Sequence, residues 1–440
     1  MKKYYSNLVN KKATANASWL VVEKLITMML VLIASVLIAR HLGPDDYGRL
    51  SYLISIVALL APFSTLGLNG IVIKEFVVKS DKQDMVLSTS LIMRLIGGSI
   101  SCVALFFVVW LGEIQHLEDY IWGLALLSFV NIFTAFHVID CWFQSIVSSK
   151  YIVWTRLSVL LLMFTVKVIL VVLDKGLTSF IIAVAIESLL ISLGFALLYY
   201  GFVTKIKIFE AKFNYGLKLL KQSRWLIFSG FASIINLKID QVMLGTLVSV
   251  EEVGIYSVAS KLSEVWYFFP VALVTSFFPS LLNKKKTSES QYESSLQRLC
   301  DVLFLSAFVV AILVTFFGEF IISILFGSDY LASIPILIIH IWASIFVFMR
   351  ALLSKWLIAE EILHFSLLSH GIGAVVNVVL NLILIPVYMG IGAATASVVS
   401  YAMASYFCLF LYPKTRVMAK IMTKSIILPV RLNGYLRGVR

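Results

Sequence analysis

The stretch ASWLVVEKLITMMLVLIASVLIA, residues 17–39, is predominantly apolar and carries no charge except for one adjacent acid–base pair, Glu23 and Lys24. A helix needs about 20 apolar residues to cross the roughly 30 Å hydrocarbon core of a bilayer, so this stretch is long enough to span one. Its apolar side chains occur at all helical angles instead of on one stripe, which is typical of a helix inside a membrane bundle. Four lysines (2, 3, 11 and 12) precede this full-length span without a cleavage site, so we interpret it as an uncleaved first anchor.

Eleven further apolar runs follow, and together they predict twelve spans. The predicted spans are 17–39, 50–73, 86–111, 120–145, 151–173, 179–203, 224–248, 253–282, 299–326, 333–358, 362–387 and 392–413. Of the 440 residues 60% are hydrophobic and 14% charged, whereas soluble domains average about 45–50% and 25%. The apolar runs are continuous and do not alternate with period two, which argues against a transmembrane barrel. We therefore expect an all-α polytopic membrane protein without a large soluble enzyme domain.

The basic residues between the predicted spans indicate the orientation of the chain. Of the 36 Lys and Arg residues, 26 fall at the N-terminus, in alternate loops or in the C-terminal tail, and only Arg40, Arg49 and Lys175 fall on the other side. Positive loops stay in the cytoplasm, so both termini are predicted to be cytoplasmic. The same bias and anionic lipid headgroups account for the net charge of +12, so we predict no nucleic-acid partner.

The two halves of the sequence repeat each other weakly. A shift of 206 residues places Asp45-Asp46-Tyr47-Gly48 on Glu251-Glu252-Val253-Gly254. Six spans separate the two copies, so the repeat is parallel, as in transporters whose halves enclose a substrate path. We predict an N-terminal six-helix bundle at 1–205, a C-terminal six-helix bundle at 206–415, and a basic amphipathic cytoplasmic tail at 416–440. A duplicated bundle that serves only as a scaffold is the alternative.

Charged residues inside the predicted spans are the candidates for a functional site. A charge at the centre of a bilayer costs about 2.5–3.5 kcal/mol on insertion scales, so such residues should face a cavity or a partner. Arg156 and Lys24 lie near a cytoplasmic end, where we expect their side chains to reach the interface. The residues harder to explain in this way are Arg94, Lys238, Asp240, Lys261, Glu264 and Arg350. Interhelical ion pairs that only fix packing are the structural alternative.

Cysteine and histidine form no recognisable metal or redox motif. The four cysteines, Cys102, Cys141, Cys300 and Cys408, are too scattered for a disulfide framework or a CxxC site, and the six histidines show no HExxH spacing. The chain also lacks a glycine-rich phosphate loop for ATP. We expect no metal site and no cofactor.

Three stretches of the chain resemble one family. They are 39–48 (ARHLGPDDYG), 239–245 (IDQVMLG) continuing to 252–259 (EVGIYSVA), and 380–386 (LNLILIP) followed by 390–394 (GIGAA). The chain is similar to the Wzx-type flippases for O-antigen repeat units, which belong to the multidrug/oligosaccharidyl-lipid/polysaccharide exporter superfamily. The motifs contain turn-forming Gly and Pro and a helix face of small residues, so we interpret them as motifs that maintain the fold.

The resemblance implies a MATE-like fold with two six-helix bundles around a central cavity, and a function as a flippase. It implies that undecaprenyl-pyrophosphate-linked oligosaccharide crosses from the inner to the outer leaflet of the bacterial inner membrane. The transport would proceed by alternating access and would be coupled to an ion. Arg94, Lys238, Lys261 and Arg350 would then contact the substrate, and Asp240 and Glu264 would couple to a proton or another ion. Membrane lipids, a polysaccharide polymerase and a chain-length regulator are the implied partners. The alternatives are a multidrug or cation antiporter of the same superfamily and a membrane glycosyltransferase or polymerase.

Overall fold

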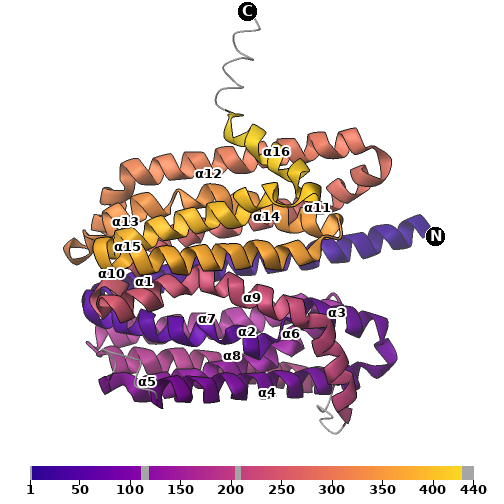
Figure 1. Cartoon of the computed structure of the whole chain (residues 1–440). Coiled ribbons are helices and arrows are strands. Elements are labelled where there is room, and N and C mark those ends of the chain that lie inside the picture. Colours follow the sequence, from indigo (N-terminus) through magenta and orange to yellow (C-terminus); the bar gives the residue numbers. More distant parts are fainter. Residues whose placement is uncertain (1, 111–117, 204–209, 429–440) are drawn as a thin grey trace, which may run out of the picture. The chain divides into compact units, whose positions relative to one another are not determined.

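The computed structural model describes residues 2–110, 118–203 and 210–428. All regular elements in these ranges are helices, and the long helices of each compact unit lie side by side (Figure 1). The α-helices are α1 (Lys2–Leu59), α2 (Ala61–Thr65), α3 (Asn69–Val78), α4 (Gln83–Trp110), α5 (Ile121–Phe133), α6 (Val138–Ser145), α7 (Ser149–Val172), α8 (Leu177–Val203), α9 (Phe213–Leu247), α10 (Val250–Glu264), α11 (Phe268–Thr287), α12 (Glu289–Leu325), α13 (Ser333–His340), α14 (Ala343–Ala359), α15 (Leu363–Ser405) and α16 (Arg416–Ile426). Short 3₁₀ helices occupy Ser80–Lys82, Glu118–Tyr120, Thr134–His137, Val265–Tyr267, Ser328–Tyr330, Phe407–Phe410 and Pro413–Thr415.

The described residues contain 11 helical segments that are long and apolar enough to cross a membrane, which confirms the multi-pass, all-α fold class. The count differs from the predicted twelve at His364–Phe410, a segment of 47 residues in which the sequence predicts two spans. At 1.5 Å per residue such a segment is about twice the length of a span, so it must fold back. It does so at Met389, whose φ of 49° and ψ of −130° break α15 shortly after Pro386.

The predicted tight turn after the first span lies at Gly43. Gly43 has a φ of 72° and a ψ of 175°, so the 58 residues of α1 form two helices that meet there. Glycine tolerates this φ because it has no Cβ, and Pro44 suits the first turn of the next helix because that position needs no N–H partner.

One predicted span is interrupted where the sequence analysis expected a continuous helix. Between α2 and α3, Leu66 and Gly67 adopt left-handed φ values of 49° and 59°, so the prediction of an unbroken helix over 50–73 was wrong. A break leaves backbone carbonyls without helical partners, and these must be satisfied inside the protein. At the break, Leu66 N donates to the carbonyl of Pro62 at 2.9 Å and Leu68 N to that of Thr65 at 3.0 Å. At the preceding junction of α1 and α2, Ser101 Oγ donates to the carbonyl of Leu60 at 2.9 Å, and Asn131 Nδ2 donates to that of Val57 at 3.1 Å. Polar side chains on neighbouring helices therefore support this region.

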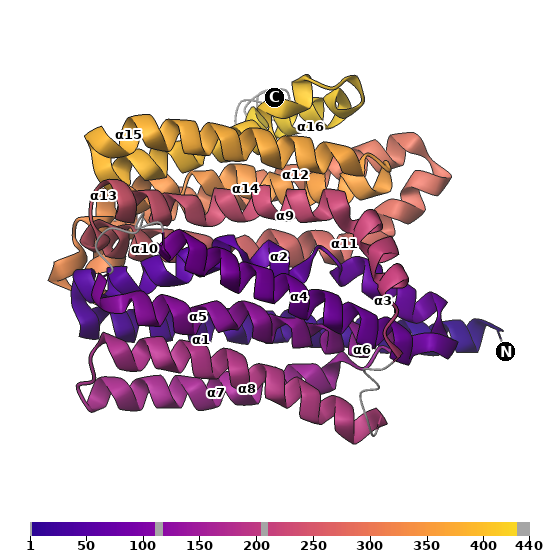
Figure 2. The ribbon, with the colours of Figure 1, turned by 60° about the horizontal axis from the view of Figure 1, so that its bottom comes forward.

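The N-terminal compact unit consists of residues 1–234 together with Ser249–Gly254. Within it α1 packs on α7, α7 on α8, and α4 on α2 and α5 (Figure 2). Its core includes the buried aromatic residues Phe76, Phe143 and Phe195. The start of α9 is fastened to this unit, since the hydroxyl of Tyr215 donates to Glu75 at 2.6 Å. The unit thus extends beyond residue 205, up to Ile234 in α9.

The C-terminal compact unit consists of Ile235–Val248 and residues 255–440. Within it α12 packs on α11, α14 and α16. Helix α16 is amphipathic, as predicted for residues 416–440: Met418, Ile421 and Met422 are buried and its lysines are exposed. Ser425 anchors it by donating to Asp301 at 2.7 Å. Residues 429–440 of the predicted tail lie outside the described part of the chain.

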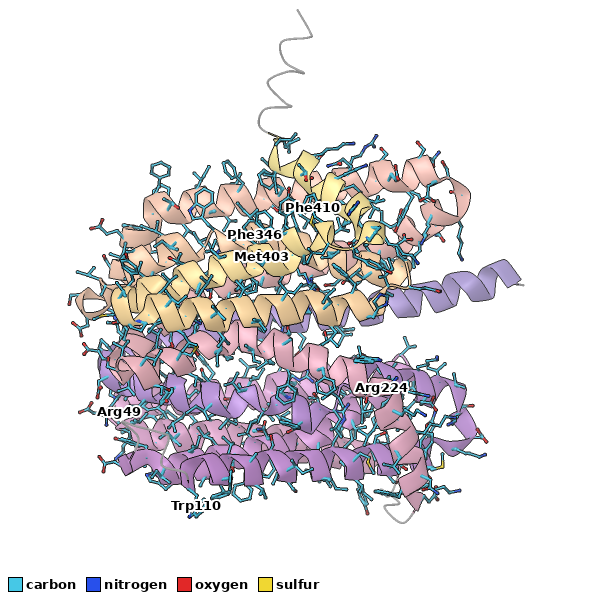
Figure 3. All side chains as sticks on the ribbon, viewed as in Figure 1. Arg49, Trp110, Arg224, Phe346, Met403 and Phe410 are labelled. Carbon is cyan, nitrogen blue, oxygen red and sulfur yellow. The ribbon has the colours of Figure 1, made fainter. Side chains whose placement is uncertain are left out.

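Many helix faces expose large apolar side chains, as expected for surfaces that meet lipid. Trp110 at the end of α4 is 78% exposed and projects away from the neighbouring helices (Figure 3). Phe316 on α12 is 80% exposed. Water-soluble monomers rarely expose large contiguous apolar patches, so these faces fit a hydrocarbon environment.

Two glycines related by the sequence repeat pack against each other in the N-terminal unit. A Cβ on Gly48 would overlap the carbonyl oxygen of Val250, and a Cβ on Gly254 would overlap that of Pro44. The shift of 206 residues that relates Gly48 to Gly254 also relates Pro44 to Val250. The contact is therefore reciprocal, and only glycine at both positions allows the two backbones to approach this closely.

We predict that Gly48→Ala and Gly254→Ala each destabilise the protein, by about 1–3 kcal/mol as for other overpacked sites. The measurement is the melting temperature of the purified protein in detergent. Gly201→Ala in α8 is the matched control, because a Cβ there meets open space and alanine favours a helix. Unchanged melting of both variants would show that the backbones can separate without loss.

Candidate functional site

Asp240 in α9 is the centre of a buried polar cluster in the C-terminal unit. Its side chain accepts hydrogen bonds from the hydroxyl of Tyr256 in α10 at 2.7 Å and from Nδ2 of Asn381 in α15 at 2.6 Å. A third bond comes from Ser397 Oγ, which lies in α15 beyond the break at Met389. Asp240 is 2% exposed. One carboxylate therefore ties together α9, α10 and both parts of α15.

All of these donors are neutral, and the described residues give Asp240 no ion pair. Lys238, two residues earlier, does not compensate it, since residues i and i+2 point to different sides of a helix. The amide oxygen of Asn381 is buried beside the carboxylate and has no donor within the described residues. The cluster thus offers several oxygen atoms and a single negative charge, an arrangement that suits a small cation or a proton.

Lys238, Lys261 and Glu264 are partly exposed. Lys238 is close enough to the buried His340 of α13 to act on it electrostatically. Glu264 and Asp240 both act on the hydroxyl of Tyr401 in α15. The C-terminal unit therefore contains five of the six predicted site residues. Asp240 is buried, Lys238 and Glu264 act on His340 and Tyr401 near it, and Lys261 lies in α10 together with Tyr256.

Arg350 in α14 is the fifth predicted residue, and it is enclosed in the core of the same unit. Its Nη1 donates to Ser369 Oγ and to the carbonyl of Ala404, both at 2.8 Å. Its Nε and Nη2 have no acceptor within the described residues. Buried apolar residues of the core cluster, including Met349 and Leu353, adjoin it along α14.

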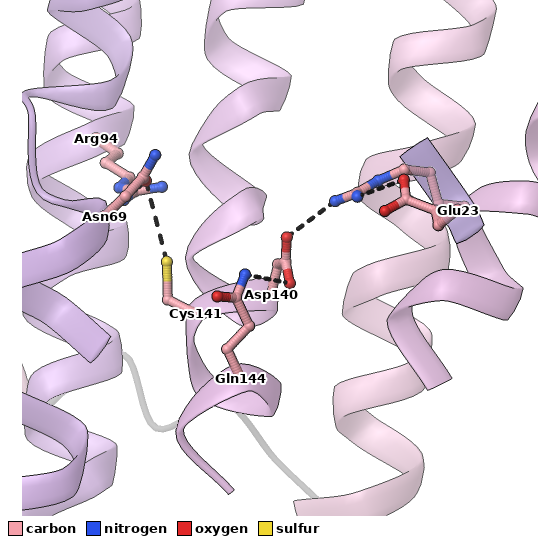
Figure 4. Close-up of polar contacts among 7 residues, drawn as sticks. Glu23, Asn69, Arg94, Asp140, Cys141 and Gln144 are labelled. Carbon is pink, nitrogen blue, oxygen red and sulfur yellow. Dashed lines mark hydrogen bonds and ion pairs between the residues drawn. The ribbon is translucent and has the colours of Figure 1, made fainter. Parts of the chain in front are cut away.

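Arg94 in α4 is the sixth, and it lies in the N-terminal unit. Its Nη2 donates to Oδ1 of Asn69, the first residue of α3, at 2.6 Å (Figure 4). Arg94 is 0% exposed, and its Nε and Nη1 have no acceptor within the described residues. The Sγ atom of Cys141 lies 4.0 Å from the same Asn69 oxygen. Arg94 is therefore a buried cation whose described contacts include no carboxylate.

Other charges inside the spans are paired. Arg156 in α7 contacts Glu23 of α1 and Asp140 of α6, both at 2.9 Å (Figure 4). Our expectation that Arg156 reaches the interface was wrong, because two carboxylates hold it between helices. Lys167 of α7 likewise pairs with Glu187 of α8 at 2.5 Å. Lys24 is exposed, as a side chain directed to the interface should be.

The sequence analysis missed the neutral members of these clusters. It treated the family motifs as fold-keeping only, yet Asp240, Tyr256 and Asn381 come from two of them and meet in the structure. The signal that could have found Asn381 is its spacing from Asn377, since two amides four residues apart share one face of an otherwise apolar helix. No group of three or more His, Cys, Asp or Glu side chains suitable for a metal ion occurs in the described ranges.

Two family models match the chain. The model described as polysaccharide biosynthesis protein matches residues 13–285, and that of lipid II flippase MurJ matches residues 177–432. An uncharacterized membrane protein of Methanocaldococcus jannaschii is 22% identical over 89% of this chain and 82% of its own length. A probable low-salt glycan biosynthesis flippase, Agl15 of Haloferax volcanii, is 23% identical over 44% of this chain and 41% of its own length.

Solved structures show the same fold. Lipid II flippase MurJ in an inward closed conformation superposes with a TM-score of 0.72 at 17% identity, covering 92% of this chain and 90% of that one. An inward-facing multidrug resistance MATE transporter of the MOP superfamily gives 0.70 at 14% identity, covering 91% and 98%. Because each family model covers more than half of the chain, the protein belongs to the polysaccharide biosynthesis protein family and to the lipid II flippase MurJ family.

Proposed function

We propose that this protein moves lipid-linked oligosaccharide across a cytoplasmic membrane, from the inner to the outer leaflet, by alternating access. The substrate class follows from the two families and from the glycan flippases that the chain resembles. The specific substrate we infer is an oligosaccharide repeat unit on an undecaprenyl-type pyrophosphate carrier, as in O-antigen export. Both termini then lie in the cytoplasm, and a polymerase and a chain-length regulator act on the product outside.

The observation that supports this proposal is that some cations inside the spans have ion-pair partners and others have none. Arg156 and Lys167 have carboxylate partners, whereas Arg94, Arg350 and Lys238 have no ion pair within the described residues. An unpaired cation is costly in a membrane and therefore marks a functional site. A pyrophosphate-linked sugar is a multiply charged anion, and it would supply the missing negative charge while its headgroup crosses the hydrocarbon.

The Asp240 cluster supports ion coupling. Binding of a proton or a sodium ion would neutralise Asp240 and change the hydrogen bonds that hold α9, α10 and α15 together. Glu264 lies near enough to share this role, since both acids act on Tyr401. Ion binding in this cluster would thereby bias the C-terminal unit toward one of two helix arrangements.

We predict that Lys238→Gln and Lys261→Gln each slow flipping by at least about tenfold, since each removes a charge that screens the anion. The assay uses proteoliposomes that contain a fluorescent polyprenyl-pyrophosphate oligosaccharide, whose exposure is measured by quenching from outside. Lys420→Gln on the exposed face of α16 is the matched control, because it makes the same change of charge.

Wild-type flipping rates in both lysine variants would remove these residues from the substrate path. Failure of the wild-type protein to flip the lipid would remove the proposed function itself. Stabilisation of the purified protein by lipophilic cations, and not by lipid-linked oligosaccharide, would instead favour the antiporter.

We predict that Asp240→Asn makes flipping independent of the ion gradient. The amide keeps the size of the side chain and cannot carry the coupling charge. Flipping is measured with a proton gradient, a sodium gradient or neither, and the gradient that accelerates the wild-type protein identifies the ion. Asp329→Asn at an exposed turn is the matched control. A variant that still responds to the gradient would place coupling elsewhere, with Glu264→Gln as the next variant to test.

A further inference from the structure

The second predicted span restarts as a new helix in its middle. Helix α2 ends at Thr65, Leu66 and Gly67 turn the chain through left-handed conformations, and α3 begins at Asn69. The first N–H groups of a helix have no partner within the helix, and they carry roughly half a positive charge. Asn69 and Gly70 are both exposed, and a Cβ on Gly70 would meet open space. The positive end of α3 is therefore accessible within a membrane-spanning segment.

Arg94 adds a full positive charge behind this helix end. Its Nη2 is bonded to Asn69 Oδ1, so the guanidinium is directed at the first residue of α3. Two further N–H-bearing atoms, Nε and Nη1, are buried without an acceptor in the described residues. A buried donor that makes no hydrogen bond costs about 1–3 kcal/mol, which indicates a missing partner.

The carboxylate of Asp140 does not supply the missing acceptor for Arg94. Asp140 acts on Arg94 electrostatically, but its carboxylate oxygens are engaged by Arg156 Nη2 at 2.9 Å and by Gln144 Nε2 at 3.0 Å (Figure 4). The exposed Lys74, four residues beyond Gly70, lies on the same face of α3 and adds positive charge. Arg350 offers no comparable site, since its partners Ser369 and Ala404 are buried. Arg94 and Arg350 are both buried with unsatisfied donors, and of these two it is Arg94 that is bonded to a residue at an exposed helix start.

We propose that Asn69, Gly70, Lys74 and Arg94 form an oxyanion site in the N-terminal unit, which holds the pyrophosphate of the lipid-linked substrate. The proposal rests on the proposed flippase function and specifies the part of the substrate that this unit binds. The anion accepts hydrogen bonds from the N–H groups at the start of α3 and replaces the Asn69 amide oxygen as the acceptor for Arg94. Helix N-termini bind phosphate groups in this way in many proteins.

The test uses the purified full-length protein and inorganic pyrophosphate as the probe, with binding measured by calorimetry at fixed ionic strength. Asn69→Asp places a carboxylate of the same size against Arg94. The resulting internal ion pair should keep the protein folded and weaken pyrophosphate binding by about 10- to 100-fold, the effect of losing hydrogen bonds to a charged group. Lys74→Gln, an exposed change that does not disturb packing, should weaken it severalfold.

Asn283→Asp at an exposed position of α11 is the matched control, because it makes the same chemical change in the C-terminal unit, and the variant should bind pyrophosphate normally. Glycerol 3-phosphate, the headgroup fragment of membrane phospholipids, should bind more weakly than pyrophosphate. Equal binding of the two probes would overturn the assignment in favour of a phospholipid headgroup.

Two further results would overturn the site: no binding of pyrophosphate to the wild-type protein, or unchanged binding in both Asn69→Asp and Lys74→Gln. The proteoliposome assay separates this failure from failure of the proposed function. Flipping that persists unchanged in Asn69→Asp contradicts the site alone. Specific pyrophosphate binding without any flipping contradicts the flippase function and leaves the site in place.

Discussion

Charge burial in a medium of low polarity is the constraint on which the rest of this structure depends. An ionised side chain inside the membrane needs an opposite charge, hydrogen bonds or a ligand. The protein contains three arrangements: Arg156 pairs with two carboxylates, Asp240 accepts hydrogen bonds from neutral donors, and Arg94 keeps donors without acceptors among the described residues. The first arrangement holds helices together, whereas the other two leave a charge that an ion or a substrate can neutralise.

Breaks in the helices position these charges. The break at Met389 reverses the chain within α15, so that Asn381 before it and Ser397 after it both reach Asp240. The break at Gly67 creates the start of α3 next to Arg94. Irregular backbone is tolerated at membrane depth only where protein or water satisfies it, so functional groups gather where that support already exists. The polar chemistry of both units depends on interruptions in otherwise regular spans.

Apolar run length and loop charge were sufficient to predict the helical class and the approximate position of each span. They worked because hydrocarbon imposes the same requirement on every crossing. The break at Leu66 and Gly67 escaped prediction because the spans were drawn from apolar run length alone, which gave no weight to Pro62, Gly67 and the Asn69-Gly70 pair as turn signals. The choice of Asp240 followed from its charge, whereas its partners Tyr256, Asn381 and Ser397 are neutral and lie up to 157 residues away in sequence. Only the folded chain shows that Arg156 forms ion pairs with two acids, whereas Arg94 forms none with the residues that the structure describes.

The reciprocal packing of Gly48 and Gly254 also bears on how the duplicated sequence can diverge. Each glycine packs against the backbone of the other copy, so a methyl group at either position would have to fit between the same two backbone segments. A first methyl group that forces the backbones apart would make room for a second, and the two changes would be non-additive. Loss of both glycines would then cost less than the sum of the two single losses, so what one repeat can tolerate at this position depends on the residue in the other.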